Sequence, residues 1–193
     1  MRTNCLLCGI GGQGTVVASN LIATAALYQK MEVKASDTIG MAWRGGSVVS
    51  HVRYGKKVYS PLITEGEADV IIAFEPAEAV RHLHYLKEGG TVIVCTRPVI
   101  PVASALAHSY ETNVLLHYLH ENAENVIEVD MKKESNRNIN IKLLATAVKS
   151  GVLGLSEESL RYAVEKAMPE KAKKASLHLL DEFFGVVNTT SAN

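Results

Sequence analysis

Six residues near the start of the chain, GIGGQG, constrain its fold more than any other stretch. The run before them, residues 4–10, is apolar in the manner of a buried parallel strand, and residues 15–30 have helical character. Gly9, Gly11 and Gly14 therefore form a G-x-G-x-x-G turn where a Rossmann-type phosphate loop belongs. Glycines there allow a tight turn, close approach to a phosphate and helix–strand packing. The helix N-terminus adds unpaired N–H groups and about half a positive charge.

The same spacing has a second interpretation, a glycine turn that only packs a helix on a sheet. A dinucleotide dehydrogenase would also need an acid at the end of the second strand to hold the ribose hydroxyls. Here Glu32 begins that predicted strand, Asp37 lies later than the usual spacing, and no P-loop lysine follows the glycines. The sequence supports an NAD site poorly, whereas a phosphate-bearing ligand and a packing turn both stay open.

Strand-like runs alternate with helical patterns along most of the chain, which predicts a parallel, doubly wound sheet. Residues 47–60 predict a β-hairpin with its turn near Gly55. We therefore expect an α/β, Rossmann-like, mostly parallel sheet with a β-hairpin and a helical C-terminal third. A single domain is expected over 1–193, with the sheet core in 1–135 and the helical part in 136–193. The other expected strands are 32–37, 68–76, 91–96 and 125–131, and the other expected helices are 77–90, 113–120, 139–153, 156–167 and 169–187.

Charge and hydropathy exclude several classes of protein. Twenty Lys and Arg balance twenty Asp and Glu, and no basic stripe appears, so nucleic acid is not an expected partner. No apolar stretch is long enough for a membrane helix, and residues 5–10 are too short for the core of a secretory signal. Three cysteines without a scaffold pattern fit a reducing compartment. We therefore expect a cytoplasmic protein with no membrane contact.

A second informative loop, GMAWRGGSVVSHVRYG, covers residues 40–55. Arg44 stands ahead of the glycine pair Gly45 and Gly46, where an arginine can present a bidentate fork to a phosphate or carboxylate. The alternative for Arg44 is a solvated loop charge. Trp43, the only tryptophan in the chain, can equally be a hydrophobic plug under the loop.

Three separated motifs, GIGGQG, GMAWRGGSVVSHVRYG and GGTVIVCTRPVIPV, together resemble the gamma-type subunit of the 2-oxoacid:ferredoxin oxidoreductases. Within that family they are most similar to the beta subunit of the indolepyruvate branch, and the resemblance covers nearly the whole chain. It implies a Rossmann-like companion in an enzyme that decarboxylates a 2-oxoacid on thiamine diphosphate and Mg. Such enzymes pass electrons through iron–sulfur clusters to ferredoxin and give the acyl group to coenzyme A. The resemblance places the thiamine and cluster sites in a larger alpha subunit, leaving no cofactor on this chain alone.

The resemblance also implies which residues of this chain contribute to ligand binding. Ile39 and Trp43 depart from the family pattern, where histidine and glutamine are usual, so the substrate can be indolepyruvate or another aryl or branched 2-oxoacid. The family's glycine loop and R-G-G-S turn fall on Gly9, Gly11, Gly12, Gln13, Gly14, Arg44, Gly45, Gly46 and Ser47.

Cys5 and Cys8 have the spacing of a metal or redox pair. A structural zinc or iron–sulfur site needs about four ligands, and only Cys95 remains to join them. Because an odd spacing on a strand points side chains to opposite faces, we expect buried strand cysteines and no metal site.

The histidines do not assemble into a site in the sequence. His82 and His84 flank one residue of a predicted helix and face apart. His117 and His120 lie one turn apart, where an exposed helix face is favoured over a metal pair. His51 follows the R-G-G-S turn and can face a partner or a ligand.

The sequence carries little catalytic equipment, since it has no G-x-S-x-G elbow and no nucleophile paired with a histidine at a recognisable spacing. Glu75 ends a predicted strand at the edge where such sheets bind ligands, although capping the next helix is the alternative. We expect a non-catalytic subunit, inactive alone, that supports a thiamine subunit and seats coenzyme A phosphates on residues 11–14 near Arg44. A free-standing NAD(P)-dependent dehydrogenase and a nucleotide-binding assembly module are the alternatives. An isolated chain can form a homodimer through its unpartnered apolar surface.

Overall fold

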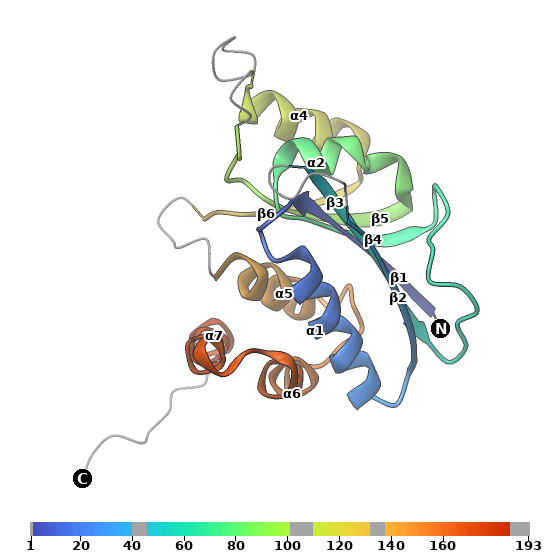
Figure 1. The fold of residues 1–193 in the computed structure, drawn as a ribbon. Helices are drawn as coiled ribbons and strands as arrows, with labels where there is room; N and C mark the ends of the chain where they lie inside the picture. Colours follow the sequence, from blue (N-terminus) through green and yellow to red (C-terminus); the bar gives the residue numbers. More distant parts are fainter. Residues whose placement is uncertain (1, 40–45, 101–109, 132–137, 186–193) are drawn as a thin grey trace.

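The computed structural model describes residues 2–39, 46–100, 110–131 and 138–185, which form a mixed sheet with helices on both faces (Figure 1). The strands are β1 (Arg2–Ile10), β2 (Glu32–Ile39), β3 (Ser47–Gly55), β4 (Ala68–Ala73), β5 (Leu86–Cys95) and β6 (Asn125–Val129). The helices are α1 (Thr15–Tyr28), α2 (Pro76–Arg81), α4 (Thr112–Asn122), α5 (Ile139–Lys149), α6 (Glu157–Ala167) and α7 (Glu170–Phe184), with a 3-10 turn, η1 (Leu83–Tyr85), after α2.

The strands lie in the order β2-β3-β1-β4-β5-β6. Neighbours among β1, β4, β5 and β6 pair in parallel, and β3 pairs antiparallel with both β1 and β2. Parallel neighbours need crossover connections, and helices supply them. The expected α/β fold with a mostly parallel sheet is therefore confirmed.

The hairpin predicted over residues 47–60 is wrong, and β3 forms an antiparallel pair with β2 instead. β3 does not fold back on residues 56–60 at Gly55; instead it pairs with β2 on one edge and with β1 on the other. Both edges of β3 are thus occupied, which leaves no edge for a second arm. Residues 56–63 are held by side chains instead: Arg53 donates to the carbonyl oxygens of Ser60 at 3.2 Å and Leu62 at 2.6 Å.

The prediction of a helix over residues 77–90 was wrong about where the helix ends. α2 ends at Arg81, η1 follows, and the chain enters β5 at Leu86, which pairs with Ala68 of β4. The register then shifts before Thr91, where the regular pairing resumes. Gly89 lies with a φ of +70° in the irregular stretch between them. Glycine allows this positive φ, which here belongs to an irregularity inside a strand and not to a helix end.

Two hydrophobic layers enclose the sheet (Figure 1). α1, α5, α6 and α7 cover one face, and α2 and α4 cover the other. Side chains of β1 alternate between these layers, so Cys5 and Leu7 face α1 whereas Leu6 and Cys8 face α2. The expectation of buried strand cysteines on opposite faces is confirmed. Burial raises the pKa of both thiols, which keeps them protonated.

α5, α6 and α7 form the helical C-terminal part, and they pack on the same face as α1. The Ser156 hydroxyl caps α6 by accepting the N–H of Ser159 at 3.1 Å, and Pro169 directly precedes α7. Both expected helix starts are confirmed, while the division of the domain at residue 135 stays a prediction. Within the described ranges no helix has both the length and the apolar character that crossing a membrane requires.

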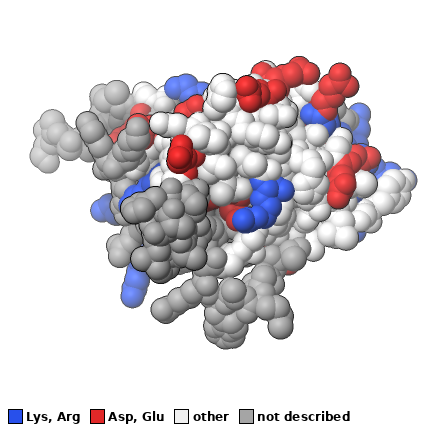
Figure 2. Space-filling model, turned by 90° about the horizontal axis from the view of Figure 1, so that it is seen from above, with Lys and Arg blue, Asp and Glu red and all other residues white. Residues whose placement is uncertain are grey.

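The direction in which each strand leaves the sheet defines where a ligand can bind. β1 leads into α1 on one face, whereas β4 leads into α2 on the other (Figure 1). The carboxyl ends of these two neighbouring strands therefore form the topological switch point, the usual ligand crevice of open α/β sheets. Figure 2 looks down on the side that α2 and α4 cover, where acidic and basic side chains are interspersed.

Candidate functional site

The glycine loop lies at this switch point, between the end of β1 and the start of α1. Gly12 and Gly14 have φ angles of +98° and +89°, which L side chains rarely adopt, and Gly14 precedes α1 without a side-chain cap. Gly9 is needed for a different reason: a Cβ there would lie 2.8 Å from the Cβ of Phe74. The loop glycines thus serve backbone conformation at Gly12 and Gly14, and close packing of β1 on the end of β4 at Gly9.

Gln13 braces the carboxyl ends of β1 and β4. Its Oε1 accepts the N–H of Ile10 at 2.7 Å, and its Nε2 donates to the carbonyl oxygen of Phe74 at 3.1 Å. The side-chain amide is therefore engaged within the protein. Sequence reasoning placed Gln13 in the loop but did not find this bridge, because it joins residues 61 positions apart.

The second predicted motif meets the first. The N–H of Gly11 donates to the carbonyl oxygen of Gly46 at 2.9 Å, so the glycine loop and the R-G-G-S turn lie side by side. Ser47, the next residue, donates its hydroxyl proton to Glu78 at 2.5 Å. The predicted Arg44 and Gly45, together with Trp43, lie outside the described residues.

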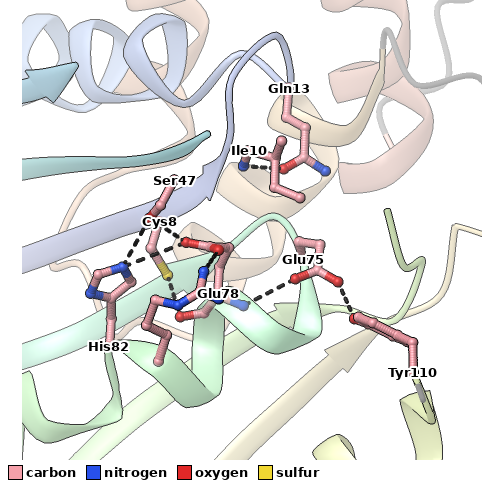
Figure 3. A network of polar contacts seen from close by, with 9 residues as sticks. Cys8, Ile10, Gln13, Ser47, Glu75, Glu78, His82 and Tyr110 are labelled. Atoms are coloured by element: carbon pink, nitrogen blue, oxygen red, sulfur yellow. Dashed lines mark hydrogen bonds and ion pairs between the residues drawn. The ribbon is translucent and has the colours of Figure 1, made fainter. Parts of the chain in front are cut away.

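Two buried carboxylates from the start of α2 stand beside these loops (Figure 3). Glu75 caps α2 by accepting the N–H of Glu78 at 3.0 Å, and it also accepts the hydroxyl proton of Tyr110. Capping, the alternative interpretation of Glu75, is therefore what the structure contains. Sequence reasoning missed Glu78 and Tyr110. The only local signal was for Glu78, which stands three positions after Glu75, the spacing of a capping pair.

Glu78 is kept ionised by its neighbours. Burial alone would raise its pKa, but hydrogen bonds from His82 and Ser47 and the charge of Arg81 outweigh burial and lower it. His82 Nε2 lies 3.3 Å from the Ser47 hydroxyl and 3.5 Å from the Glu78 carboxylate. A charged acceptor makes the Ser47 hydrogen bond stronger than a neutral one would be. Burial and then Glu75 raise the pKa of Tyr110, which stays a hydrogen-bond donor.

A hollow of about 190 Å³ opens next to the glycine loop. Its lining combines two residues of that loop, an arginine and three apolar residues, a mixture suited to a phosphate ester that carries an apolar group. Sequence reasoning did not single out Arg97, although it lies in the quoted motif GGTVIVCTRPVIPV, directly after β5. The lining residues are Gly12, Gln13, Arg97, Pro98, Val99 and Ile139.

His51 lies inside the chain, and the structure does not bear out the possibility that it faces a partner or a ligand. It is 6% exposed, its Nδ1 accepts the N–H of Ile63 at 3.2 Å, and its ring meets Tyr85 edge-on. Burial first, and then the charges of His82 and Arg53, lower the pKa of His51. The ring is therefore neutral at pH 7 and serves as a backbone acceptor.

Replacing His51 with asparagine is expected to flatten the pH dependence of stability. A histidine with a depressed folded pKa contributes stability above its unfolded pKa of about 6.5, and this is lost as the pH falls through the folded pKa. Asparagine Oδ1 can accept from Ile63 without titrating, so His51→Asn should remove a slope of up to about 1.4 kcal/mol per pH unit between pH 7 and 5. Urea unfolding across this range measures it. His117→Asn, at a histidine whose side chain is 74% exposed, is the control, and parallel profiles for His51→Asn and wild type would contradict the assignment.

The remaining candidates for metal or dinucleotide binding are used elsewhere. The described residues contain no group of three or more His, Cys, Asp or Glu side chains able to hold a metal, and His120 pairs with Glu128 at 2.8 Å. Glu32 accepts the N–H of Val58, and Asp37 accepts the hydroxyl proton of Ser19. β3 also separates β2 from β1, so Asp37 does not end the strand next to the glycine loop, where a ribose-binding acid is needed.

The comparisons with known proteins cover almost the whole chain. Residues 4–181 match the family model described as pyruvate ferredoxin/flavodoxin oxidoreductase. The indolepyruvate oxidoreductase subunit IorB of Thermococcus kodakarensis is 34% identical over 176 residues, which is 87% of each chain.

Two solved structures have the same fold as this chain. The pyruvate oxidoreductase subunit PORC of Thermotoga maritima superposes with a TM-score of 0.64 at 18% identity, over 95% of this chain and 96% of that one. A 2-oxoglutarate:ferredoxin oxidoreductase of Magnetococcus marinus, solved with 2-oxoglutarate, coenzyme A and succinyl-CoA bound, matches with a TM-score of 0.62 at 16% identity. That match spans 100% of this chain and 32% of the other. These structural matches show the fold alone, and the sequence matches establish the family. The chain belongs to the pyruvate ferredoxin/flavodoxin oxidoreductase family and is a subunit of a 2-oxoacid:ferredoxin oxidoreductase.

Proposed function

We propose that this subunit seats the phosphates of coenzyme A in the hollow beside its glycine loop, for a reaction whose chemistry takes place on a partner subunit. The observation that carries the proposal is the hollow itself, which lies at the switch point and is lined by Gly12, Gln13 and Arg97. Phosphates bind where glycine-loop N–H groups and a helix N-terminus meet a cation. Coenzyme A supplies phosphates together with less polar groups for Val99 and Ile139.

Each lining group has a distinct part in this seat. The Gly11 and Gln13 amides donate to the carbonyl oxygens of Gly46 and Ile10, so the seat draws on the N–H of Gly12 and on the positive end of the α1 dipole. Arg97 offers a guanidinium whose planar fork matches a phosphate. Gln13 fixes the loop without contributing its amide to the ligand. Arg44 and Gly45 stay predicted members of the site.

The cofactors of the whole enzyme fit a partner better than this chain. Complexes of this family use thiamine diphosphate and iron–sulfur clusters. Cys5, Cys8 and Cys95 are buried, and burial raises the pKa of each thiol, which disfavours the thiolate that a cluster needs. We therefore assign thiamine diphosphate with Mg and the clusters to an alpha-type partner, which transfers electrons to ferredoxin. The acyl group of an aryl or branched 2-oxoacid, such as indolepyruvate, would then pass to coenzyme A.

A charge placed in the loop tests the seat. The complex, purified anaerobically with its partner, is assayed for 2-oxoacid-dependent ferredoxin reduction while coenzyme A is varied. Gly12→Asp puts a carboxylate where the phosphates are expected, and we expect the KM for coenzyme A to rise at least tenfold with the KM for the 2-oxoacid unchanged. Aspartate tolerates positive φ better than most residues, so the backbone change is modest.

Gly66→Asp is the matched control. Gly66 also has a positive φ, +71°, and open space around it, but it lies in another hollow, with Arg2 and Lys87 at the amino edge of the sheet. It should leave the KM for coenzyme A as in wild type. Equal KM values in both variants would place coenzyme A elsewhere.

A further inference from the structure

One buried carboxylate connects the two loops of the candidate site to the second half of the sheet. We propose that Glu78 is a positioning residue that holds the glycine loop in shape through Ser47 and Gly46. The inference rests on the proposed function, since it states how the coenzyme A seat is kept in place. Glu78 does not line the hollow, so its effect reaches a ligand only through other residues.

The anchored end of this chain of contacts is rigid. Glu78 is 3% exposed, and its backbone N–H is held by Glu75 at 3.0 Å. Its backbone carbonyl oxygen accepts the thiol proton of Cys8 in β1 at 3.5 Å. Arg81 pairs with one carboxylate oxygen. The other accepts the Ser47 hydroxyl proton and lies 3.5 Å from His82 Nε2 (Figure 3). The carboxylate is therefore oriented from several sides before it meets Ser47.

The contact passes to the glycine loop through two adjacent residues. Ser47 donates to Glu78 at 2.5 Å, and Gly46, its chain neighbour, accepts the N–H of Gly11 at 2.9 Å. The carbonyl of Gly46 shares a planar peptide group with the N–H of Ser47, so its direction depends on how Ser47 is fixed, both by strand pairing opposite Ile10 and by Glu78. Moving Ser47 would therefore release the amide of Gly11.

The other side of the loop is fastened to the same turn. Gln13 donates to the carbonyl oxygen of Phe74, the residue before Glu75. Both sides of the loop are thus attached to the turn between β4 and α2, which lies across the switch point from α1. Glu78 supplies one of these two attachments, and Gln13 supplies the other. Loss of either removes one of the two side-chain attachments, while the backbone pairing of β3 with β1 remains.

The experiment uses the complex with its partner and reads out both loop structure and ligand binding. Ser47→Ala removes the hydroxyl, Glu78→Gln keeps the shape but removes the charge, and Ser47→Thr keeps a hydroxyl for rescue. Hydrogen exchange at the Gly11 amide is measured residue by residue without ligand, and KM values are measured for coenzyme A and the 2-oxoacid. Ser159→Ala is the control, because it removes another fully buried hydroxyl, one in α6 that donates to the carbonyl oxygen of Ser156 at 2.7 Å.

We expect Ser47→Ala and Glu78→Gln to speed exchange at Gly11 by about tenfold and raise the KM for coenzyme A about as much, with kcat nearly unchanged. Ser47→Thr should restore both, and Ser159→Ala should change neither. Faster exchange with an unchanged KM for coenzyme A would uphold the positioning role and contradict the proposed seat. Unchanged exchange at Gly11 in both Ser47→Ala and Glu78→Gln would overturn the inference, whatever the KM values.

Discussion

Replacing Arg53 with methionine is expected to lower the free energy of unfolding by about 3 kcal/mol. Arg53 is 7% exposed, and its guanidinium donates to the side chain of Asn4 at 3.0 Å and to the carbonyl oxygens of Ser60 and Leu62. Methionine fills much of the volume but leaves these oxygens without a donor. Because the same bonds hold residues 56–63, that segment should also lose protection from hydrogen exchange.

Chemical denaturation of the purified chain measures this effect. Arg161→Met is the matched control, since Arg161 makes ion pairs with Glu157 and Asp181 but keeps 25% of its side chain exposed. A partly exposed pair should cost about 1 kcal/mol or less. If the two variants lost equal stability, the buried guanidinium would have no special weight in this fold.

Replacing Gly9 with alanine is expected to cost about 2 kcal/mol and to displace the glycine loop. An added Cβ would lie 2.8 Å from the Cβ of Phe74, 2.9 Å from Gln13 Oε1 and 3.1 Å from Thr15 Oγ1. Gln13 can move only by giving up its bridge between β1 and β4. The Phe74 Cβ is fixed to the backbone of the neighbouring strand, so shortening Phe74 to alanine should not relieve the clash.

Gly12→Ala separates steric conflict from backbone strain. Nothing lies within 4 Å of a Cβ at Gly12. Alanine there should therefore lower the free energy of unfolding only through the backbone strain of a φ of +98°, by about 1 kcal/mol. Thermal or urea unfolding of both variants compares the two costs. A smaller loss at Gly9 than at Gly12 would show that β1 and β4 can separate locally, against the packing described above.

Local patterns predicted the parts of the fold that depend on neighbours in the chain. The strand–loop–helix from β1 to α1, the alternation of Cys5 and Cys8, and the start of α6 all follow from short-range patterns. The glycine loop was also placed correctly at the carboxyl end of β1. Its candidate role as a phosphate seat stays a prediction.

The arrangement of distant segments could not be predicted in the same way. β3 inserts between β1 and β2, and nothing in its own residues states which strand it joins. The contact from Ser47 to Glu78 crosses 31 positions, and the bridge from Gln13 to Phe74 crosses 61. The sequence predicted a helix longer than α2 because the apolar pattern continues beyond Arg81, yet Leu86 pairs with β4 instead. Strand order and side-chain networks are tertiary properties, which outweigh local propensity.

The most direct test of this account is to isolate the tagged chain from its own cells under anaerobic conditions and identify what comes with it. Bound protein is identified by mass, and thiamine and iron are assayed in the same sample. We expect a larger partner that carries thiamine diphosphate and iron, in a complex that reduces ferredoxin when a 2-oxoacid and coenzyme A are supplied. Recovery of the chain alone, with a nucleotide bound and no thiamine or iron, would contradict it.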